Sequence, residues 1–176
     1  MNLQKFTDKI INFNDKSRVW IYQADRILTD NEVNSIAQEL KPFISSWAHH
    51  GLPLKADFGV LYNLFIVFVV DETIADVGGC GIDKSVHIIQ KITRDLKVDF
   101  FNRLAIAYFN EEKIACIDKD SFSELINTDQ GWTEENLVFN NQINTLAALK
   151  NNWIIPFKNS WHKDFFETKD SFNLSL

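Results

Sequence analysis

The sequence contains few residues that break regular structure or cross-link a chain. Its 176 residues include six glycines, three prolines and two cysteines. Cys80 and Cys116 are too few for a disulfide framework and belong to no Cys-x-x-Cys pair, which is typical of a reduced, cytoplasmic protein. The longest apolar run, residues 64–70, is far shorter than the ~20 residues that a membrane helix needs, and the first residues lack a signal-peptide core. We therefore expect a cytoplasmic protein without a membrane segment.

An excess of positive charge is also missing. The formal net charge is −6 at pH 7, and the isoelectric point is near 5.2. Because an acidic surface repels nucleic acids and anionic membranes, we expect neither as a partner. Apolar residues, in contrast, are abundant: 45% of the chain is hydrophobic, and it has fifteen phenylalanines and five tryptophans. Length and composition together predict a single globular domain over residues 1–176.

The first part of the chain contains helical and extended patterns in turn. Apolar residues at spacings of three and four predict a short helix within residues 3–13, and the β-branched and aromatic residues 19–22 predict a strand. Thr29 and Glu32 form a capping box at the start of a longer amphipathic helix. Since proline removes a backbone donor, we expect a kink or a broken last turn at Pro42.

The middle of the chain is rich in strand patterns. Residues 54–71 are long enough for two strands, and we expect the turn between them near residues 57–59. The run 64–70 does not alternate between apolar and polar residues, which predicts a central strand covered on both faces. An apolar stripe at helical period predicts a second long helix over residues 82–96.

The remaining patterns are shorter. Residues 104–108 and 113–117 predict a hairpin, and Ser121 with Glu124 predicts a capped helix. The last expected elements are a strand at 137–139, a helix at 142–150 and an extended segment at 153–157.

This order of elements predicts an α+β fold. Strand, helix, two strands, helix and hairpin resemble a ferredoxin-like split βαββαβ core with one added hairpin strand. Such a core has a mostly antiparallel sheet with helices on one face. We expect residues 1–17 to form a helical extension, residues 18–130 the α+β core, and residues 131–176 a C-terminal extension packed on the core.

A glycine-rich segment at residues 78–85 is the most informative local feature. Its sequence Gly-Gly-Cys-Gly-Ile-Asp-Lys-Ser stands between a strand pattern and a helix pattern, and Gly78, Lys84 and Ser85 match a Walker phosphate loop. Asp83, however, occupies the place of the second glycine of that loop, where a carboxylate repels phosphate. The segment therefore predicts a turn before a helix that binds an anion without binding a nucleotide in the Walker manner.

Several phrases of the sequence resemble an uncharacterised bacterial protein family that is labelled as an ABC transporter ATPase. The phrases lie at residues 20–23, 47–51 (Trp-Ala-His-His-Gly), 79–85, 138–141 and 158–162. The resemblance spans residues 18–163 and implies a shared fold, while the label implies ATP hydrolysis. This chain lacks the Leu-Ser-Gly-Gly-Gln signature of such ATPases and has Asp83 in its phosphate loop, so its residues argue against that activity.

Cys80 and the helix that follows it permit two interpretations. The helix dipole, together with Lys84 and His87 one and two turns along, favours a reactive thiolate. The alternative is a small buried residue in a tight turn, with Asp83 as the helix N-cap. Likewise the stripe of Lys84, His87, Lys91 and Arg94 is either an acid-binding surface or the solvated face of a helix.

Two hypotheses about function follow from these residues. The first is a non-catalytic binding module that takes a small anionic ligand or a protein partner, with no cofactor and no metal. Its expected ligand-binding residues are Gly78, Gly79, Gly81, Asp83, Lys84 and Ser85. The second is a small enzyme with Cys80 as nucleophile and His87 or His50 as base.

Overall fold

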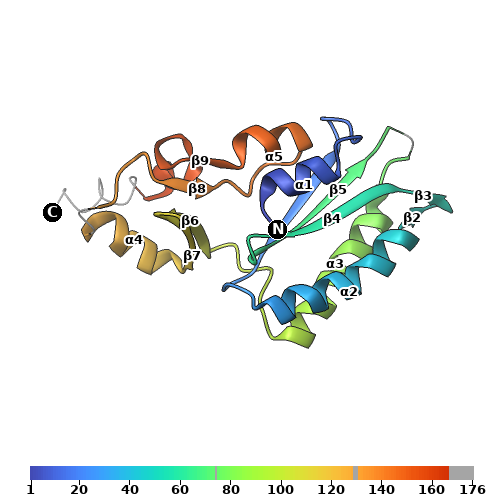
Figure 1. The fold of residues 1–176 in the computed structure, drawn as a ribbon, viewed down its shortest axis with the longest axis horizontal. Helices are drawn as coiled ribbons and strands as arrows, with labels where there is room; N and C mark the ends of the chain where they lie inside the picture. Colours follow the sequence, from blue (N-terminus) through green and yellow to red (C-terminus); the bar gives the residue numbers. More distant parts are fainter. Residues whose placement is uncertain (74, 129–130, 167–176) are drawn as a thin grey trace.

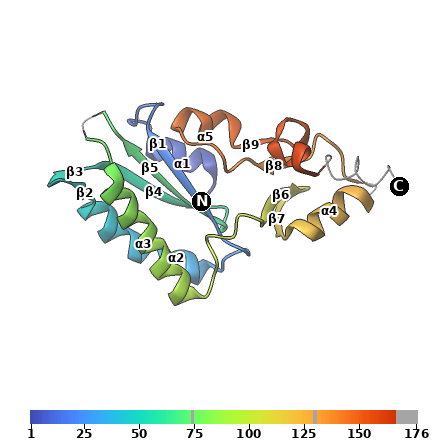
Figure 2. The same cartoon turned by 180° about the vertical axis from the view of Figure 1, so that it is seen from behind.

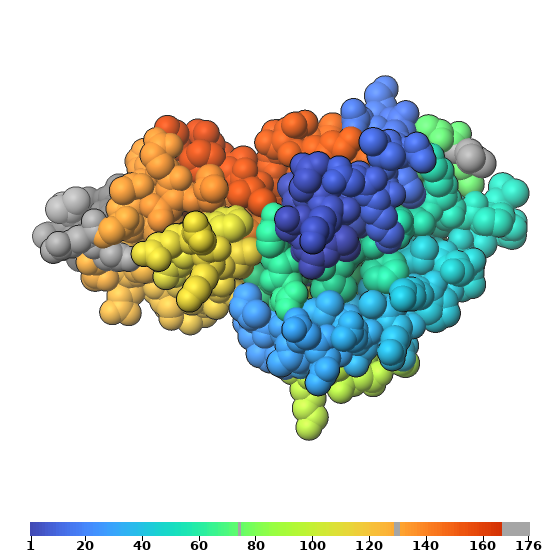
Figure 3. Space-filling model, in the orientation of Figure 1, coloured from blue at the N-terminus to red at the C-terminus, as the bar shows by residue number. Residues whose placement is uncertain are grey.

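The structure is a computed structural model that describes residues 1–73, 75–128 and 131–166. It contains helices and antiparallel strands, as the sequence predicted. Figure 1 shows two neighbouring parts: a sheet with helices on both sides, and a second sheet of shorter strands with helix α4 beside it. In the space-filling view the two parts lie against each other (Figure 3). The two parts are joined by the chain between α3 and β6 and again by the chain between β8 and β9.

The first sheet has three antiparallel strands in the order β1-β5-β4. Their bounds are Arg18–Gln23 for β1, Lys55–Leu61 for β4 and Phe65–Asp71 for β5. β5 is central, and all its residues are buried, which confirms the interpretation of the unbroken apolar run. A strand with neighbours on both edges and layers on both faces has no side that needs polar residues.

The turn between β4 and β5 lies at Tyr62 and Asn63, whose φ angles are 55° and 52°. The predicted turn near residues 57–59 is therefore wrong. Gly59 serves a different purpose, because a Cβ atom there would lie 2.7 Å from Cδ2 of Phe6 in helix α1 (Leu3–Lys9). The glycine lets α1 pack closely on β4, and the hydrophobic α1 residue Phe6 fills the space.

Helices cover both faces of this sheet, whereas the sequence predicted helices on one face. α2 (Asp30–Ser46) and α3 (Gly78–Leu96) lie on one face. α1 and α5 (Leu146–Asn152) lie on the other, as Figures 1 and 2 show from opposite sides. The three-layer arrangement explains why the central strand needs apolar residues along its whole length.

The capping box at the start of α2 is confirmed. The backbone N–H of Glu32 donates to Oγ1 of Thr29 at 3.3 Å, and the backbone N–H of Thr29 donates to Oε2 of Glu32 at 2.8 Å. Arg26 pairs with the same carboxylate at 2.8 Å and holds the pKa of Glu32 down to about 2. The helix continues past Pro42 to Ser46, so its last turn is not broken there.

The second sheet has four antiparallel strands in the order β7-β6-β8-β9. Their bounds are Ile106–Asn110 for β6, Lys113–Ile117 for β7, Leu137–Phe139 for β8 and Ile154–Pro156 for β9. The predicted hairpin, strand and extended segment are thereby confirmed. The pairing of β8 with β6 ties the last third of the chain to the region before it.

Two helices in this half begin elsewhere than predicted. α4 (Lys119–Thr128) is capped by Asp118, whose Oδ1 accepts from the backbone N–H groups of Asp120 and Ser121, and not by a Ser121 box. α5 begins at Leu146, with the side chain of Thr145 accepting from the N–H of Ala148. An aspartate or threonine at the N-cap satisfies the free amides of the first turn.

The strands form separate sheets where the sequence predicted one. Besides the sheets of three and four strands, β2 (Ala48–His49) and β3 (Leu52–Pro53) pair in a small hairpin. A fourth strand of a split βαββαβ sheet would lie beside β1. The chain around residues 144–146 occupies one end of that position. There the N–H of Val19 donates to the Asn144 carbonyl at 3.0 Å, and the N–H of Leu146 donates to the Ser17 carbonyl at 2.9 Å.

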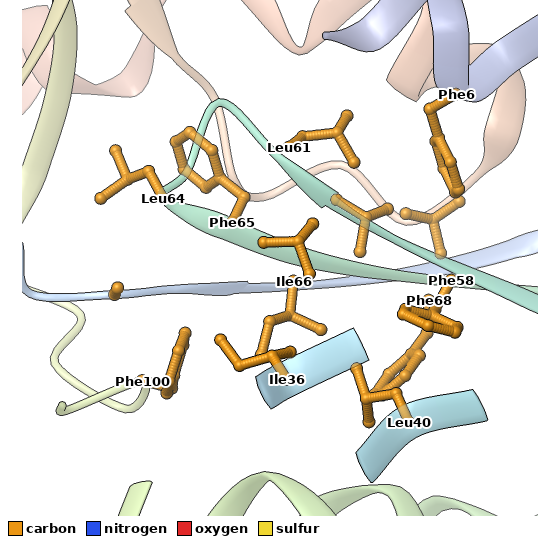
Figure 4. Packing of buried hydrophobic residues seen from close by; sticks show 14 of the residues in the cluster. Phe6, Ile36, Leu40, Phe58, Leu61, Leu64, Phe65, Ile66, Phe68 and Phe100 are labelled. Atoms are coloured by element: carbon orange, nitrogen blue, oxygen red, sulfur yellow. The ribbon is translucent and has the colours of Figure 1, made fainter. Parts of the chain in front are cut away.

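Figure 4 shows how the core is built around β4 and β5. Phe6 packs on one side of the sheet, and Ile36 and Leu40 of α2 pack on the other. Ile36 is 1% exposed and Leu40 is fully buried. Within the described part of the chain, no helix has both the length and the apolar character needed to cross a membrane.

Replacing Ile36 or Leu40 by alanine should lower the free energy of unfolding by about 2–5 kcal/mol, because a cavity forms between α2 and the sheet. Urea unfolding of each variant measures the loss. Asn34→Ala on the exposed side of the same helix is the control and should change stability by less than about 0.5 kcal/mol. A loss below about 1 kcal/mol at both buried positions would contradict this packing.

Candidate functional site

Residues 78–85 form the first two turns of α3 and not a turn before it. α3 begins at Gly78, and its N-cap residue is Val77, which makes no side-chain capping bond. The expectation of Asp83 as N-cap is therefore wrong, since this exposed residue lies inside the helix. Three glycines in this segment suggest a loop because glycine is a weak helix former, yet α3 begins at the first of them and Trp47 bonds to the third.

Gly78 and Gly81 are explained by the segment that packs against them. Gly78 has φ +55°, and a Cβ atom there would lie 2.4 Å from the ring of His49. A Cβ atom on Gly81 would lie 2.8 Å from Cγ2 of Val77, and the Gly81 carbonyl accepts a hydrogen bond from Nε1 of the buried Trp47 at 3.1 Å. Trp47 at the end of α2 and His49 of the following hairpin thus fix the position of the start of α3.

The histidine pair of that hairpin has a structural role. Nδ1 of His49 lies 2.9 Å from the carbonyl oxygen and 3.3 Å from Oδ1 of Asp76, just before α3. His50 is exposed, has φ 48° and places its ring 4.2 Å from the ring of His49. These contacts fix the β2–β3 hairpin against the chain that leads into α3.

The predicted catalytic candidates are not brought together along α3. Cys80 and His87 are both exposed and stand seven residues apart in one helix, which separates them by roughly 10 Å along the axis. A base must lie within about 3 Å of the proton that it takes. Ser85 is fully buried and donates to the carbonyl of Ile82 at 2.7 Å, so its hydroxyl is occupied inside the protein.

Cys116, the second cysteine, is also a structural residue. Its thiol donates to the carbonyl of Ala24 at 3.6 Å, and Nε2 of Gln23 donates to its sulfur at the same distance. Burial raises the pKa of Cys116 to about 11, which keeps the thiol protonated and unreactive at neutral pH.

A groove of about 440 Å³ runs between α2 and α3 and includes two of the predicted site residues. Its apolar residues are Phe43, Trp47 and Ile88, and its basic residues are Lys84, His87 and Lys91. Lys91 already pairs with Glu39 at 2.8 Å and with Asp95 at 3.1 Å, and both carboxylates raise its pKa. Lys84 makes one long contact, 3.4 Å from Nζ to the Ala48 carbonyl. The positive charge least engaged within the groove is therefore that of Lys84.

A second hollow, which the sequence did not predict, lies where the two sheets meet. This cleft has a volume of about 420 Å³. Its lining includes Tyr22, Gln23, Phe100, Phe101, Arg103, Phe139, Asn141, Gln142, Trp161 and His162. Their phrases at 20–23, 138–141 and 158–162 each combine an aromatic residue with an amide or imidazole, which is the signal that could have grouped them.

A chain of hydrogen bonds crosses the floor of this cleft. Nδ2 of Asn141 donates to Oε1 of Gln23 at 2.7 Å, and Oδ1 of Asn141 accepts from Nε1 of Trp153 at 2.9 Å. Nε2 of Gln23 donates to the Ala105 carbonyl at 2.9 Å. The amides of Gln23 and Asn141 are thereby engaged within the protein and link β1 to the second sheet.

His162 is the most strongly perturbed imidazole of the chain's described part. It is 2% exposed, and its burial lowers its pKa to about 4, so the ring is neutral at pH 7. Nδ1 lies 3.3 Å from Oγ of Ser160, and the ring stacks on Trp161 with centroids 3.9 Å apart. This histidine was not among the candidates for a site that the sequence favoured.

Residues 1–73, 75–128 and 131–166 contain no group of three or more His, Cys, Asp or Glu side chains placed to hold a metal ion. Comparison of the chain with protein-family models, with curated proteins and with solved structures gave no match.

Gly78→Ala should lower the free energy of unfolding by about 2 kcal/mol or more, because the new methyl group clashes with His49 and the backbone has a left-handed conformation. Gly79→Ala is the matched control: a Cβ atom there meets nothing within 4 Å, and alanine favours helix, so stability should rise by about 0.5 kcal/mol. Thermal unfolding of both variants checks the pair. Equal effects of the two substitutions would contradict the packing of His49 against Gly78.

Stability should fall as pH drops from 7 to 5, by about 2 kcal/mol through His162 alone. The folded-state pKa is about 4 against an ordinary 6.5, so the unfolded chain takes up the proton first and gains stability from it. Urea unfolding at both pH values should show this part of the loss in the wild type and not in His162→Phe. His87→Gln, at an exposed histidine, should retain it. The same loss in His162→Phe would contradict a buried neutral ring.

Proposed function

We propose that this protein is a non-catalytic, cytoplasmic binding module for a small anion or an acidic segment of a protein partner. The binding surface consists of the start of α3 and the groove between α2 and α3. The observation that carries the proposal is the combination of an apolar floor with the exposed ammonium of Lys84 and the exposed imidazole of His87, on a chain whose net charge is −6. The two free cysteines, Cys80 and Cys116, support a reducing compartment.

The start of α3 adds partial positive charge to this surface. The amides of a first helical turn have no partners within the helix, and the helix dipole favours an anion beside them. No side chain caps this helix, so these amides are not closed off by Asp83. One carboxylate already lies at this end of the helix: Oε1 of Glu72 accepts a hydrogen bond from the N–H of the N-cap residue Val77 at 3.1 Å.

The aromatic floor gives the groove a means of selecting its ligand. Phe43 and Trp47 pack against each other with ring centroids 5.0 Å apart, and Trp47 is held by its bond to Gly81. A rigid aromatic floor with a basic rim suits an acidic segment that carries apolar side chains, because both kinds of group find partners. A free anion would use the charges without the floor.

Catalysis is the less supported alternative. The enzyme hypothesis needs a base beside Cys80, and along α3 His87 stands too far away to serve directly. ATP hydrolysis of the ABC type needs a glycine loop around the phosphates, whereas residues 78–85 are helical and include Asp83. We therefore do not propose ATP hydrolysis, which the family resemblance implied.

We also propose that the β1–α2–β4–β5–α3 unit is ferredoxin-like. Supporting this is the strand order β1-β5-β4, which matches three adjacent strands of a split βαββαβ sheet. The short antiparallel bridge between Arg18 and Thr145 stands where the fourth strand would pair.

Inorganic phosphate at millimolar concentration should shift the backbone amide resonances of residues 79–85 in a ¹⁵N titration. Lys84→Gln should weaken this binding about two- to fivefold, the range expected for one exposed charge. Lys113→Gln, at an exposed lysine of the second sheet, changes the net charge equally and should leave the affinity unchanged. Amides that do not move, or equal weakening by both variants, would overturn the proposed surface.

A further inference from the structure

We propose that the cleft between the two sheets is a second, separate site that binds a small aromatic acid carrying a hydroxyl group. This inference does not depend on the proposed function, because the residues that line the cleft and those that line the α2–α3 groove are different sets. The volume of about 420 Å³ lies within the range of pockets that hold small molecules.

The walls of the cleft suit a flat, apolar ligand body. Four aromatic residues besides Tyr22 contribute to the lining: Phe100, Phe101, Phe139 and Trp161. Phe101 is 41% exposed although it packs edge-on against Tyr22, with ring centroids 5.9 Å apart. An exposed phenylalanine at the rim of an aromatic cleft offers a face to a planar ring, and stacked or edge-to-face rings attract each other.

The ring nitrogens of His162 and Trp161 determine which hydrogen-bonding groups a ligand of the cleft must carry. Oγ of Ser160 has a single proton and makes its shorter bond, 2.8 Å, to the Phe157 carbonyl. Towards His162 it must then accept, so Nδ1 carries the ring proton and Nε2 is a bare acceptor. The hydrogen bond of His162 to a residue described here is made by Nδ1, which leaves Nε2 available to a ligand. The Nε1 donor of Trp161 is buried and has no hydrogen-bond partner within the described part of the chain.

A hydroxyl group suits either of these two atoms. It donates one hydrogen bond and accepts others, whereas an amine cation or a carboxylate offers only one of the two roles. The rings of Trp161 and His162 are stacked, so the donor and the acceptor belong to one wall of the cleft. A buried polar atom without a partner is costly, so a ligand that pairs Nε1 of Trp161 gains binding energy.

Charge selection comes from Arg103. It is exposed at the rim and has no ion-pair partner in the described ranges, and neither aspartate nor glutamate lines the cleft. A guanidinium recognises a carboxylate through two parallel hydrogen bonds, which a neutral ligand cannot form. The amide side chain of Gln142 is a further polar group at the lining. A ring, a hydroxyl and an acid group are thus the features of the matching ligand.

The probe is 4-hydroxybenzoate, titrated into the whole ¹⁵N-labelled protein at pH 7. We expect saturable shifts of the indole resonance of Trp161 and of the backbone amides of residues 100–103 and 141–142. Benzoate lacks the hydroxyl group and 4-hydroxybenzyl alcohol lacks the charge, so each should bind at least about fivefold more weakly. Shifts confined to residues 78–91 would place the anion on α3 and overturn the cleft site.

Arg103→Gln should weaken 4-hydroxybenzoate about fivefold, because it removes the charge and leaves the fold unchanged. Arg94→Gln is the matched control, since Arg94 is an exposed arginine of α3 outside the cleft lining. Its affinity for the probe should equal that of the wild type. No shift at the cleft up to the solubility limit of the probe, or equal weakening by both variants, would overturn the proposal.

Discussion

The buried amide of Gln23 makes the polar contact on which the arrangement of the two sheets depends. Gln23 ends β1 and is 7% exposed, yet both of its amide atoms have partners from the second half of the chain. Its bonds run to Ala105 before β6 and to Asn141 after β8, and Asn141 is held in turn by Trp153. Because an unpaired amide is costly in such a place, these bonds define one relative position of the sheets. The cleft exists because that position leaves a hollow beside the bonds.

The packing of Trp47 is a second constraint, and it shapes the groove between α2 and α3. The indole N–H reaches the Gly81 carbonyl, and the ring contacts Trp20 and Phe68 of the first sheet with centroids 6.1 and 5.8 Å away. The tryptophan thus connects the end of α2, the start of α3 and the sheet. A larger residue at Gly78 would clash with His49, and one at Gly81 would clash with Val77 beside the Trp47 indole. The glycines that suggest a phosphate loop in the sequence therefore set the spacing of two helices.

Local patterns predicted the elements well where one physical rule decided them. The Thr29 capping box, the apolar run in β5 and the β6–β7 hairpin depend on neighbours in sequence or on complete burial, and each is confirmed. The failures depend on distant partners. Gly59 faces Phe6, and Gly78 at the start of α3 faces His49 of the β2–β3 hairpin, so neither marks a turn. The division of the strands into separate sheets follows from Gln23, whose partners stand more than eighty residues away.

The cleft was invisible in the sequence for the same reason, and its position has a physical consequence. Its lining comes from β1, from the chain after α3 and from segments that follow β8 and β9. A ligand bound there would touch both sheets, so its binding energy would stabilise the junction that Gln23 and Asn141 hold. Binding to the folded chain alone adds RT ln(1 + [L]/Kd) to stability. The groove between α2 and α3 lies on one sheet only, and an anion bound there would leave the junction as it is.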